Sequence, residues 1–549
     1  MQKGLINMQM ILRFSYAGVL LLGFVFLLLG VVIDSSFVEK YILIDSTISN
    51  ATLVKLLILR AALFVFGVAF VGYSTLRLGG NSATLRLEDR FRSLLVERPM
   101  VILTALWIVV LAFVTIERVT TVYWSWQHAT GYEYYWIGQN IAEGNGFNFQ
   151  NAERWIYSRQ STPVESMNEF SATAWEEPVY VAIIAFALST WGAAGKLALV
   201  LFNVCAFLAT CVAVYYLGRR VFNRLTGLLA STTLALWPVV SYATQRAFLI
   251  IHPALLGGAL AVICALSIVW CLEKPSTRRG TVVGALLGLA CLTLSPFLVF
   301  VPLTVILVFL MSTSRPVVRW KTSAAIVVTT IVVISPWTIR NYLAFGEFVP
   351  IRTGAGAAAH QGNPTLAATF TDGRFACAES LGPFWRAENA RDAILTANTV
   401  AGRRSDIYRR SQQCVEKNAP EGYKFFNEAQ RDNVYLKHTL AFVFSEPQTF
   451  AKLTFNKGFI FFTETSRIFA IAAFIAAVGA VLALRNWRAN VLLLMVVAYS
   501  APYCVLVAWF YRYRYPIEPL LLLLASSAVV AITSRILRNV HGRFKLETL

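Results

Sequence analysis

Long blocks of apolar residues alternate with shorter polar segments along the chain. Most blocks have about 17 to 25 residues, the length that an α-helix needs to cross about 30 Å of hydrocarbon. The candidate spans are residues 11–33, 54–76, 100–118, 197–217, 225–241, 249–272, 281–295, 297–312, 322–338, 467–484, 489–509 and 516–535. The pattern therefore predicts an all-α polytopic membrane protein with about 12 transmembrane helices.

The Lys and Arg residues between the blocks predict the orientation of the spans. They concentrate in every second connecting segment and in the C-terminal tail: Arg77, Arg86, Arg90, Arg92, Arg98, Arg219, Arg220, Arg224, Lys274, Arg278, Arg279, Arg315, Arg319, Lys321, Arg485, Arg488, Arg535, Arg538, Arg543 and Lys545. The positive-inside rule places these segments and both termini in the cytoplasm. Two large loops, residues 119–196 and 339–465, are then predicted on the external side, the periplasmic face of a bacterial inner membrane.

The same pattern divides the chain into four parts. We expect two additional N-terminal helices and a cytoplasmic loop in residues 1–99, a transmembrane core in 100–338, an external cap in 339–465, and C-terminal helices with a cytoplasmic tail in 466–549. The first apolar block is too long for a signal-peptide core and lacks a small-x-small cleavage site, so we expect it to remain as a span. Helices are also predicted within the loops, at residues 178–188, 390–417 and 428–444.

Composition supports a membrane protein and narrows its partners. Hydrophobic residues make up 57% of the chain and charged residues 14%, whereas a soluble chain of this length would form several domains with charged surfaces. The net charge is +19, from 48 Lys and Arg against 29 Asp and Glu. No solvated basic module with base-reading or base-stacking elements is visible, so nucleic acid is not an expected partner. Membrane lipids are, and the basic residues on the external side favour a phosphorylated substrate.

Cysteine positions separate into two groups. Six of the eight lie in apolar blocks and are interpreted as small buried hydrophobic residues. Cys377 and Cys414 lie instead in one external polar segment, where an oxidising compartment would permit a disulfide between them. Two separate thiols are the alternative.

The first external loop supplies acidic and aromatic candidates at both of its ends. Glu133 stands among Tyr and Trp residues just beyond a span, where partial desolvation can raise the pKa of a carboxyl towards that of a general base. A solvated loop carboxylate inside an aromatic belt is the alternative. At the far end, Glu176 and Glu177 precede Pro178 and Tyr180; they either face the same cavity as Glu133 or complement the N-terminus of the following helix.

Later segments supply candidate phosphate ligands on the same face. Arg340 and Asn341 follow the span that ends near residue 338, and the planar fork of Arg suits phosphate, although snorkelling to the lipid headgroups is the alternative. His360 and Asn363 follow a Gly-rich turn, and no second His or Cys stands at metal-ligand spacing from His360. The short segment "YRYRYP" breaks the positive-inside trend, which indicates another use for its charge: it contains Arg512, Tyr513, Arg514 and Tyr515. Arg246 is a weaker candidate of the same kind.

At these segments the chain resembles the GT-C superfamily of polyprenyl-phosphate-sugar-dependent glycosyltransferases, particularly bacterial relatives of protein O-mannosyltransferases and the lipid A aminoarabinose transferase. The matching residues are Glu133, Tyr135 and Gly144-x-Gly146-Phe147; "EEPVY" at 176–180; "PWTIRNY" and the following run to residue 363; and "YRYPIEP" at 513–519. Glu177 stands where many members have a Lys, and Leu294 where many have an Arg. The resemblance covers about residues 100–535 and implies a GT-C-like fold.

The resemblance implies an inverting glycosyltransferase that uses a polyprenyl-phosphate sugar donor and a glycan, lipid or protein acceptor. Glu133 would be the catalytic base, and Arg340, Arg512, Arg514 and Arg246 would hold the donor phosphate. The expected substrate-binding residues are Tyr135, Glu176, Glu177, Tyr180, Asn341, His360, Asn363, Tyr513 and Tyr515. No soluble nucleotide is needed by this chemistry, and a divalent metal could be bound if Glu133 and Glu176 converge. The alternatives are an O-antigen ligase or polymerase and, from another class, a transporter or flippase of a lipid-linked substrate.

Overall fold

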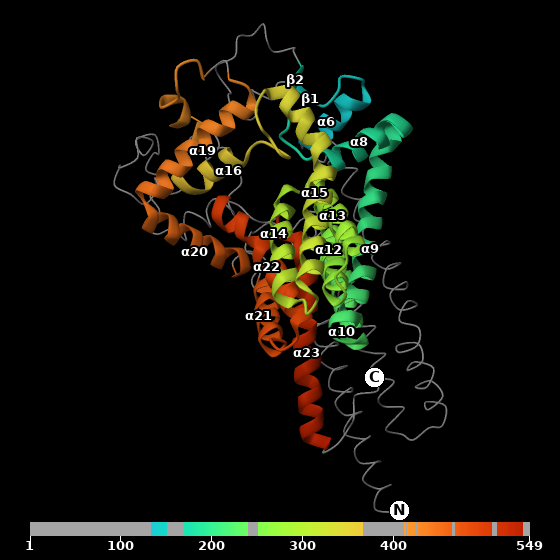
Figure 1. The fold of residues 1–549 in the computed structure, drawn as a ribbon. Helices are drawn as coiled ribbons and strands as arrows, with labels where there is room; N and C mark the ends of the chain where they lie inside the picture. Colours follow the sequence, from blue (N-terminus) through green and yellow to red (C-terminus); the bar gives the residue numbers. More distant parts are fainter. Residues whose placement is uncertain are drawn as a thin grey trace, which may run out of the picture.

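The computed structural model describes residues 133–150, 170–239, 251–365, 411–412, 414–423, 426–463, 467–507 and 513–541. The described part is nearly all helical, as predicted, and consists of a bundle of roughly parallel helices with a smaller helical cap at one end (Figure 1). The predicted spans at 11–33, 54–76 and 100–118, and most of the predicted helix at 390–417, lie outside these residues.

The helices of the bundle follow the apolar blocks of the sequence closely. They are α9 (Gly195–Val221), α10 (Arg224–Leu236), α12 (Ala254–Glu273), α13 (Thr277–Thr293), α14 (Phe300–Met311), α15 (Pro316–Phe345), α21 (Arg467–Leu482), α22 (Trp487–Leu506) and α23 (Glu518–His541). Within the described ranges, five helices are long and apolar enough to cross a membrane; α20 (Pro447–Thr463) with α21 would count as a sixth only if this bent pair were one span. The predicted number of 12 spans is therefore not confirmed, because helices such as α10 rise only about 20 Å.

Glycine allows the closest packing within the bundle. Gly280, Gly284 and Gly288 stand four residues apart on the face of α13 that meets α15. A Cβ atom added at these positions would lie 2.6, 2.5 and 2.7 Å, respectively, from the nearest atoms of α15. Small residues at this spacing let two helix backbones approach each other, which favours helix association inside a membrane.

The cap is built from both predicted external loops. The first loop contributes α6 (Glu133–Ala142), β1 (Asn148–Gln150), β2 (Phe170–Ala172) and α8 (Pro178–Trp191), and the second contributes α16 (Ala355–His360), α19 (Glu428–Ser445) and α20. The two short strands pair antiparallel, with Phe149 opposite Ser171. The predicted helix at 428–444 is confirmed as α19, which begins with a capping box between Asn427 and Gln430.

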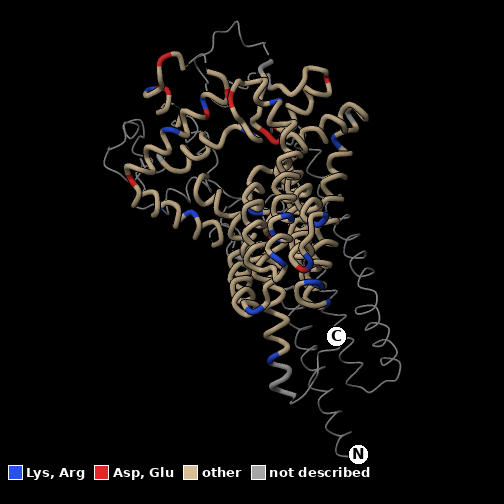
Figure 2. Tube along the Cα trace, viewed as in Figure 1, with Lys and Arg blue, Asp and Glu red and all other residues tan. Residues whose placement is uncertain are grey.

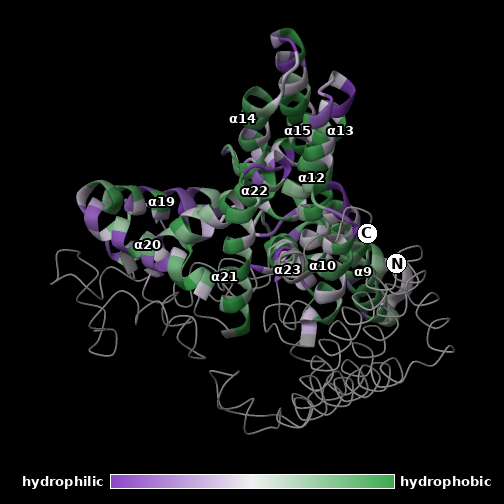
Figure 3. Cartoon of the chain, turned by 90° about the horizontal axis from the view of Figure 1, so that it is seen from below, coloured by the Kyte–Doolittle hydropathy of each residue, from purple (hydrophilic) through white to green (hydrophobic). Residues whose placement is uncertain are grey.

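Acidic residues are distributed unevenly over the molecule. They gather mainly in the cap, whereas basic positions occur both in the cap and along the bundle (Figure 2). At the end of the bundle opposite the cap, Glu273 forms ion pairs with Arg220 and Arg488, which joins α12 to α9 and α22. Seen along the bundle, the helices are predominantly hydrophobic (Figure 3). The chain is a multi-pass membrane protein, and Arg220 and Arg488, from two of the Arg-rich segments that predicted its orientation, meet at the end opposite the cap.

Candidate active site

An ionic cluster around Arg352 lies between the cap and the bundle. Arg352 belongs to the connection from α15 to α16, and its Nη1 atom lies 3.2 Å from Oε2 of Glu176 and 3.5 Å from Oε1 of Glu177. The side chains of the two glutamates are 5% and 1% exposed, and that of Arg352 is 26% exposed. Burial alone would lower the pKa of Arg352, but the two carboxylates raise it well above its usual range. The guanidinium is therefore a permanent cation that partly neutralises the acidic pair.

Glu177 connects this cluster to two further segments. Its Oε2 atom accepts a hydrogen bond of 2.5 Å from the Tyr134 hydroxyl in α6. Its Oε1 atom accepts one of 2.8 Å from the backbone N–H of Ser295, which begins the short helix η4 (Ser295–Val299). Burial, together with the charges of Glu176 and Glu177, raises the pKa of Tyr134 well above 10. Tyr134 is thus fixed as a protonated donor, and α6, the start of α8 and the end of α13 meet at one carboxylate.

Tyr513 brings the last external segment to the same place. The charge of Tyr513 is the smallest of the contributions that raise the pKa of the Arg352 guanidinium, after those of Glu177, Glu176 and Tyr134. Its ring stacks on that of Tyr503 with 4.8 Å between the centroids, and the Tyr503 hydroxyl lies 3.2 Å from that of Tyr499. Three of the sequence segments that carry candidate residues therefore meet at Arg352 and Glu177, through Tyr134, the acidic pair and Arg352 itself.

Glu133, the predicted base, is half-buried and forms the first residue of α6. The next residue, Tyr134, points to Glu177, so Glu133 projects about 100° around the helix from that contact. Tyr135 faces a third direction, where the ammonium group of Lys196 lies 5.3 Å from its ring centroid. Glu133 and the Arg352 cluster are thus connected through adjacent residues of one helical turn.

Arg340 holds the first external loop against the end of α15. Its Nη1 atom donates to the carbonyl of Thr173 at 2.7 Å and to Oδ1 of Asn341 at 3.1 Å, and its Nη2 atom donates to the carbonyl of Phe147 at 2.8 Å. The guanidinium also lies 4.9 Å from the ring centroid of Trp337. These bonds use three of the five N–H donors of an arginine and leave two. Asn341 in turn donates to the carbonyl of Ile351, beside Arg352.

Arg514 and Tyr515 are placed in the bundle. Arg514 is buried, donates to the carbonyl of Phe461 at 3.0 Å, and lies 3.9 Å over the ring of Phe469. The ring of Tyr515 packs so tightly against α12 that a Cβ atom on Gly258 would lie 2.5 Å from it. Arg514 and Arg340 therefore contact different elements. Arg512 and Arg246 lie outside the described residues.

The remaining predicted substrate-binding residues make packing contacts within the cap and at its base. The hydroxyl of Tyr180 donates to Asn203 at 2.9 Å, and Oδ1 of Asn363 accepts from Lys457 at 3.0 Å. His360 lies 2.7 Å from the Ser411 hydroxyl. Burial, and to a smaller extent His438, lowers the pKa of His360 to about 3, so the ring is neutral at ordinary pH.

The two predicted disulfide cysteines have different outcomes. Cys414 is disulfide-bonded, and the free cysteines among the described residues are Cys205, Cys211, Cys264, Cys271, Cys291 and Cys504. The expected partner, Cys377, lies outside the described residues, so the pairing stays a prediction.

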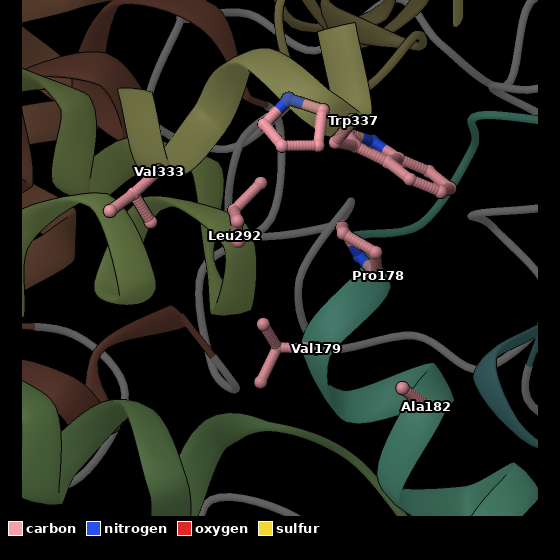
Figure 4. A pocket seen from close by; sticks show the side chains of 7 residues that line it. Pro178, Val179, Ala182, Leu292, Val333 and Trp337 are labelled. Atoms are coloured by element: carbon pink, nitrogen blue, oxygen red, sulfur yellow. The ribbon is translucent and has the colours of Figure 1, made fainter. Parts of the chain in front are cut away.

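An apolar cavity of about 330 Å³, widely open to its surroundings, adjoins the ionic cluster. Its walls come from α8, α13 and α15, whose side chains face a common space (Figure 4): Pro178, Val179, Ala182, Leu292, Val333, Pro336 and Trp337. Pro178 directly follows Glu177, and the ring of Trp337 lies against the guanidinium of Arg340. The cavity is thus bounded by two residues that also border charged groups, an arrangement that suits an apolar chain with a charged head.

The described residues do not fit a metal at the acidic pair. Glu176 and Glu177 are already paired with a cation, Arg352. In the described part of the chain, no three His, Cys, Asp or Glu residues come close enough together to hold a metal ion. The divalent metal stays a prediction, and no chemical step below depends on it.

Sequence reasoning missed Arg352, Tyr134 and Ser295. Arg352 lies in the same external run as Arg340, and two adjacent glutamates elsewhere on that face were a signal that a buried cation would accompany them. Tyr134 was overlooked because it is one of several aromatic residues around Glu133. For Ser295 the interaction is through the backbone, which side-chain identity does not reveal.

Comparisons with known proteins give a family match over part of the chain. Residues 176–339 match the family described as dolichyl-phosphate-mannose-protein mannosyltransferase. This segment begins at the acidic pair, contains every wall of the apolar cavity, and ends beside Arg340. No curated protein matches the sequence of the chain.

Among solved structures, the chain is similar to an oligosaccharyltransferase from Archaeoglobus fulgidus. The structure of that enzyme with zinc and sulfate shares 13% identity at a TM-score of 0.42, covering 73% of this chain and 45% of that one. Its structure with an inhibitory peptide and a dolichol-phosphate shares 13% identity at a TM-score of 0.41, covering 75% and 48%. The chain thus spans less than half the length of these proteins. The predicted resemblance is confirmed over residues 176–339, where the chain is similar to the dolichyl-phosphate-mannose-protein mannosyltransferase family.

Proposed function

We propose that the protein transfers a glycosyl group from a polyprenyl-phosphate donor to a hydroxyl group of a glycan, lipid or protein acceptor on the external face of the membrane. The observation that carries this proposal is the junction of the Arg352 cluster with the apolar cavity at Glu177 and Pro178. A polyprenyl phosphate likewise combines an apolar chain with a charged head group, which matches an apolar cavity beside a charged cluster. The cavity would hold the isoprenoid units next to the head group while the remaining tail stays in lipid.

The proposed chemistry is a single displacement with inversion. Glu133 removes the proton from the acceptor hydroxyl as its oxygen attacks the anomeric carbon. The bond from that carbon to the phosphate oxygen breaks, and the polyprenyl phosphate leaves with the electron pair. Arg340 is the best-placed phosphate ligand, because it adjoins the cavity wall at Trp337 and keeps two free N–H donors. Arg246 and Arg512 complete the phosphate-binding set of this proposal, whereas Arg514 is buried against Phe461 and Phe469 and is left out of it.

Arg352 has a positioning role in this scheme. The acidic pair Glu176 and Glu177 would repel a donor phosphate, and Arg352 reduces that repulsion by pairing with both carboxylates. The hydrogen bond from Tyr134 to Glu177 fixes the start of α6 against the cluster. The direction in which Glu133 points therefore depends on the cluster. The cluster therefore orients the proposed base without contacting the acceptor.

The first test is the variant Glu133→Gln, assayed in lipid nanodiscs with a panel of polyprenyl-phosphate sugars and detection of released polyprenyl phosphate. We expect loss of transfer by at least about 100-fold, within the usual range for removing a general base. Glu143→Gln is the matched control, because Glu143 is exposed at the other end of α6, and it should retain full activity. Full activity in Glu133→Gln would exclude Glu133 as the base. Absence of release from every donor by the intact enzyme would reject the proposed donor class.

A second test addresses the cavity. Val179→Trp fills the space between α8, α13 and α15 and should raise the KM for the lipid donor with a smaller effect on kcat. Phe186→Trp is the matched control, since Phe186 lies on the same helix but is exposed. An unchanged donor KM in a correctly folded Val179→Trp variant would remove the cavity from the proposal.

A further inference from the structure

Helix α20 and the end of α19 form an arm that projects sideways from the bundle at the level of the cap. Figure 1 shows the arm beside the upper end of α21, and Figure 3 shows it from below, extending away from the packed helices. The axis of α20 makes an angle of 101° with that of α21. A helix perpendicular to a membrane-spanning helix lies parallel to the membrane surface.

The two faces of α20 differ in burial, and its exposed face carries large apolar side chains. Leu453, Lys457 and Ile460 are buried against the rest of the protein. The opposite face carries Phe455 and Phe459, which are 76% and 52% exposed. Phe444, at the end of α19, is 81% exposed. The surface formed by Phe444, Phe455 and Phe459 is called the arm face below.

A helix at a water-exposed protein surface normally turns charged or polar residues outward. The arm face instead exposes aromatic rings, as expected of a surface that binds a membrane or another apolar partner. Lys452, which is also exposed on α20, would reach lipid headgroups from such a position.

Continuity with the bundle identifies the partner. Helix α21 begins four residues after the end of α20, and its own exposed side chains include Ile471 and Phe474. Exposed apolar residues on a span face lipid. The arm face therefore continues an existing lipid-facing surface at its external edge, where an amphipathic helix inserts its apolar side about 5–10 Å into the boundary between headgroups and acyl chains.

We propose that the arm face is embedded in the external lipid leaflet and anchors the cap to the membrane. Lys457, on the opposite side of α20, connects this helix to the rest of the protein through hydrogen bonds. Its ammonium group donates to the carbonyls of Gly362 and Val505 and to Oδ1 of Asn363, at 2.9–3.1 Å. Val505 lies at the end of α22, a short segment before Tyr513. The lipid-bound helix is thereby held to both the cap and the segment that reaches the Arg352 cluster.

Photocrosslinking of the full-length protein in nanodiscs of phosphatidylethanolamine and phosphatidylglycerol tests this proposal. The photoreactive residue p-benzoylphenylalanine replaces Phe444, Phe455 or Phe459 in turn, and adducts are identified by mass spectrometry. Asn433 is the control position, since it is exposed on α19 but polar. We expect lipid adducts at the three Phe positions at least five-fold above those at Asn433.

Two results would overturn the proposal. Crosslinks from the arm face to a second copy of the chain would identify a protein interface instead, and lipid yields equal to those at Asn433 would mean that the face is in water. A second measurement keeps the test independent of labelling: hydrogen exchange of residues 447–463 should rise in Phe455→Asp/Phe459→Asp but not in Phe455→Leu/Phe459→Leu. Neither readout requires a donor or acceptor, so this inference can fail while the proposed reaction stands.

Discussion

The two ends of the bundle each hold glutamates paired with arginines, but in opposite proportions and surroundings. At the end away from the cap, Glu273 pairs with Arg220 and Arg488, and all three side chains are 20–37% exposed. At the cap end, Arg352 pairs with two almost completely buried glutamates. The first cluster joins three helices that already pack together. The second joins Arg352, in the connection from α15 to α16, to Glu176 and Glu177, which precede α8. Because these charges are buried, removing one partner costs much more free energy than it does in the exposed cluster.

This difference separates a structural contact from a candidate active site. Water screens exposed ion pairs, so their contribution to stability is commonly about 0–1 kcal/mol. A buried charged cluster persists only where its geometry and hydrogen bonds are well satisfied, and such clusters concentrate at functional sites. The comparison therefore predicts different sensitivities of the two clusters to substitution, pH and salt.

The largest effect is expected at Arg352. Arg352→Gln leaves Glu176 and Glu177 buried without their cation, which should lower the free energy of unfolding by about 3–5 kcal/mol and abolish transfer. Thermal unfolding in detergent and the nanodisc transfer assay measure the two effects. The triple variant with Glu176→Gln and Glu177→Gln should regain much of the stability without regaining activity. If Arg352→Gln alone were as stable as the parent, the buried cluster would not differ from the exposed one.

A smaller effect is expected from Tyr134→Phe, which removes the hydrogen bond to Glu177. A bond to a charged acceptor contributes about 1.5–3 kcal/mol. The variant should also change the alkaline limb of stability. Because the pKa of Tyr134 is raised in the folded protein, its contribution is complete below pH 10 and is lost as the pH rises through the folded-state value.

The measurement for Tyr134 is the unfolding temperature between about pH 8 and pH 11. The difference between the parent and Tyr134→Phe should be constant up to about pH 10 and shrink above it. A difference that stayed constant to pH 11 would contradict a titrating hydroxyl at the cluster.

Glu273→Gln should have little effect. Its ion pairs are partly exposed, so the loss of stability should be no more than about 1 kcal/mol, and transfer should be unchanged. Activity and unfolding are measured as for Arg352→Gln. A loss comparable to that of Arg352→Gln would show that exposure does not distinguish the two clusters.

Salt should give the smallest effect. Raising the NaCl concentration from about 0.05 M to about 0.5 M shortens the Debye length from about 14 Å to about 4 Å and screens exposed charges more than buried ones. The small destabilisation of Glu273→Gln should therefore disappear at high salt, whereas that of Arg352→Gln should persist. Equal salt dependence in both variants would be inconsistent with the burial of the cap cluster.

The sequence by itself determined most of the bundle. Apolar blocks such as 197–217, 249–272 and 489–509 correspond to α9, α12 and α22, because a helix in lipid must satisfy its backbone hydrogen bonds internally and expose apolar side chains. Hydropathy also located the polar segments from which the candidate site is built, and the motifs at 176–180 and 336–363 indicated the glycosyltransferase class. The predicted number of 12 spans stays a prediction, because the candidate spans at 11–33, 54–76 and 100–118 lie outside the described residues.

Only the tertiary structure decided what the polar residues of the cap do. Arg340 and Arg352 are the same residue type in one external run, yet Arg340 binds backbone carbonyls and Arg352 pairs with Glu176 and Glu177. Arg514, predicted to bind phosphate, is enclosed by Phe461 and Phe469. The physical reason is that a charged side chain outside the regular helices takes its role from partners brought together over hundreds of residues. Apolar burial in a span depends on neighbouring residues, whereas the partner of Glu177 depends on the whole fold.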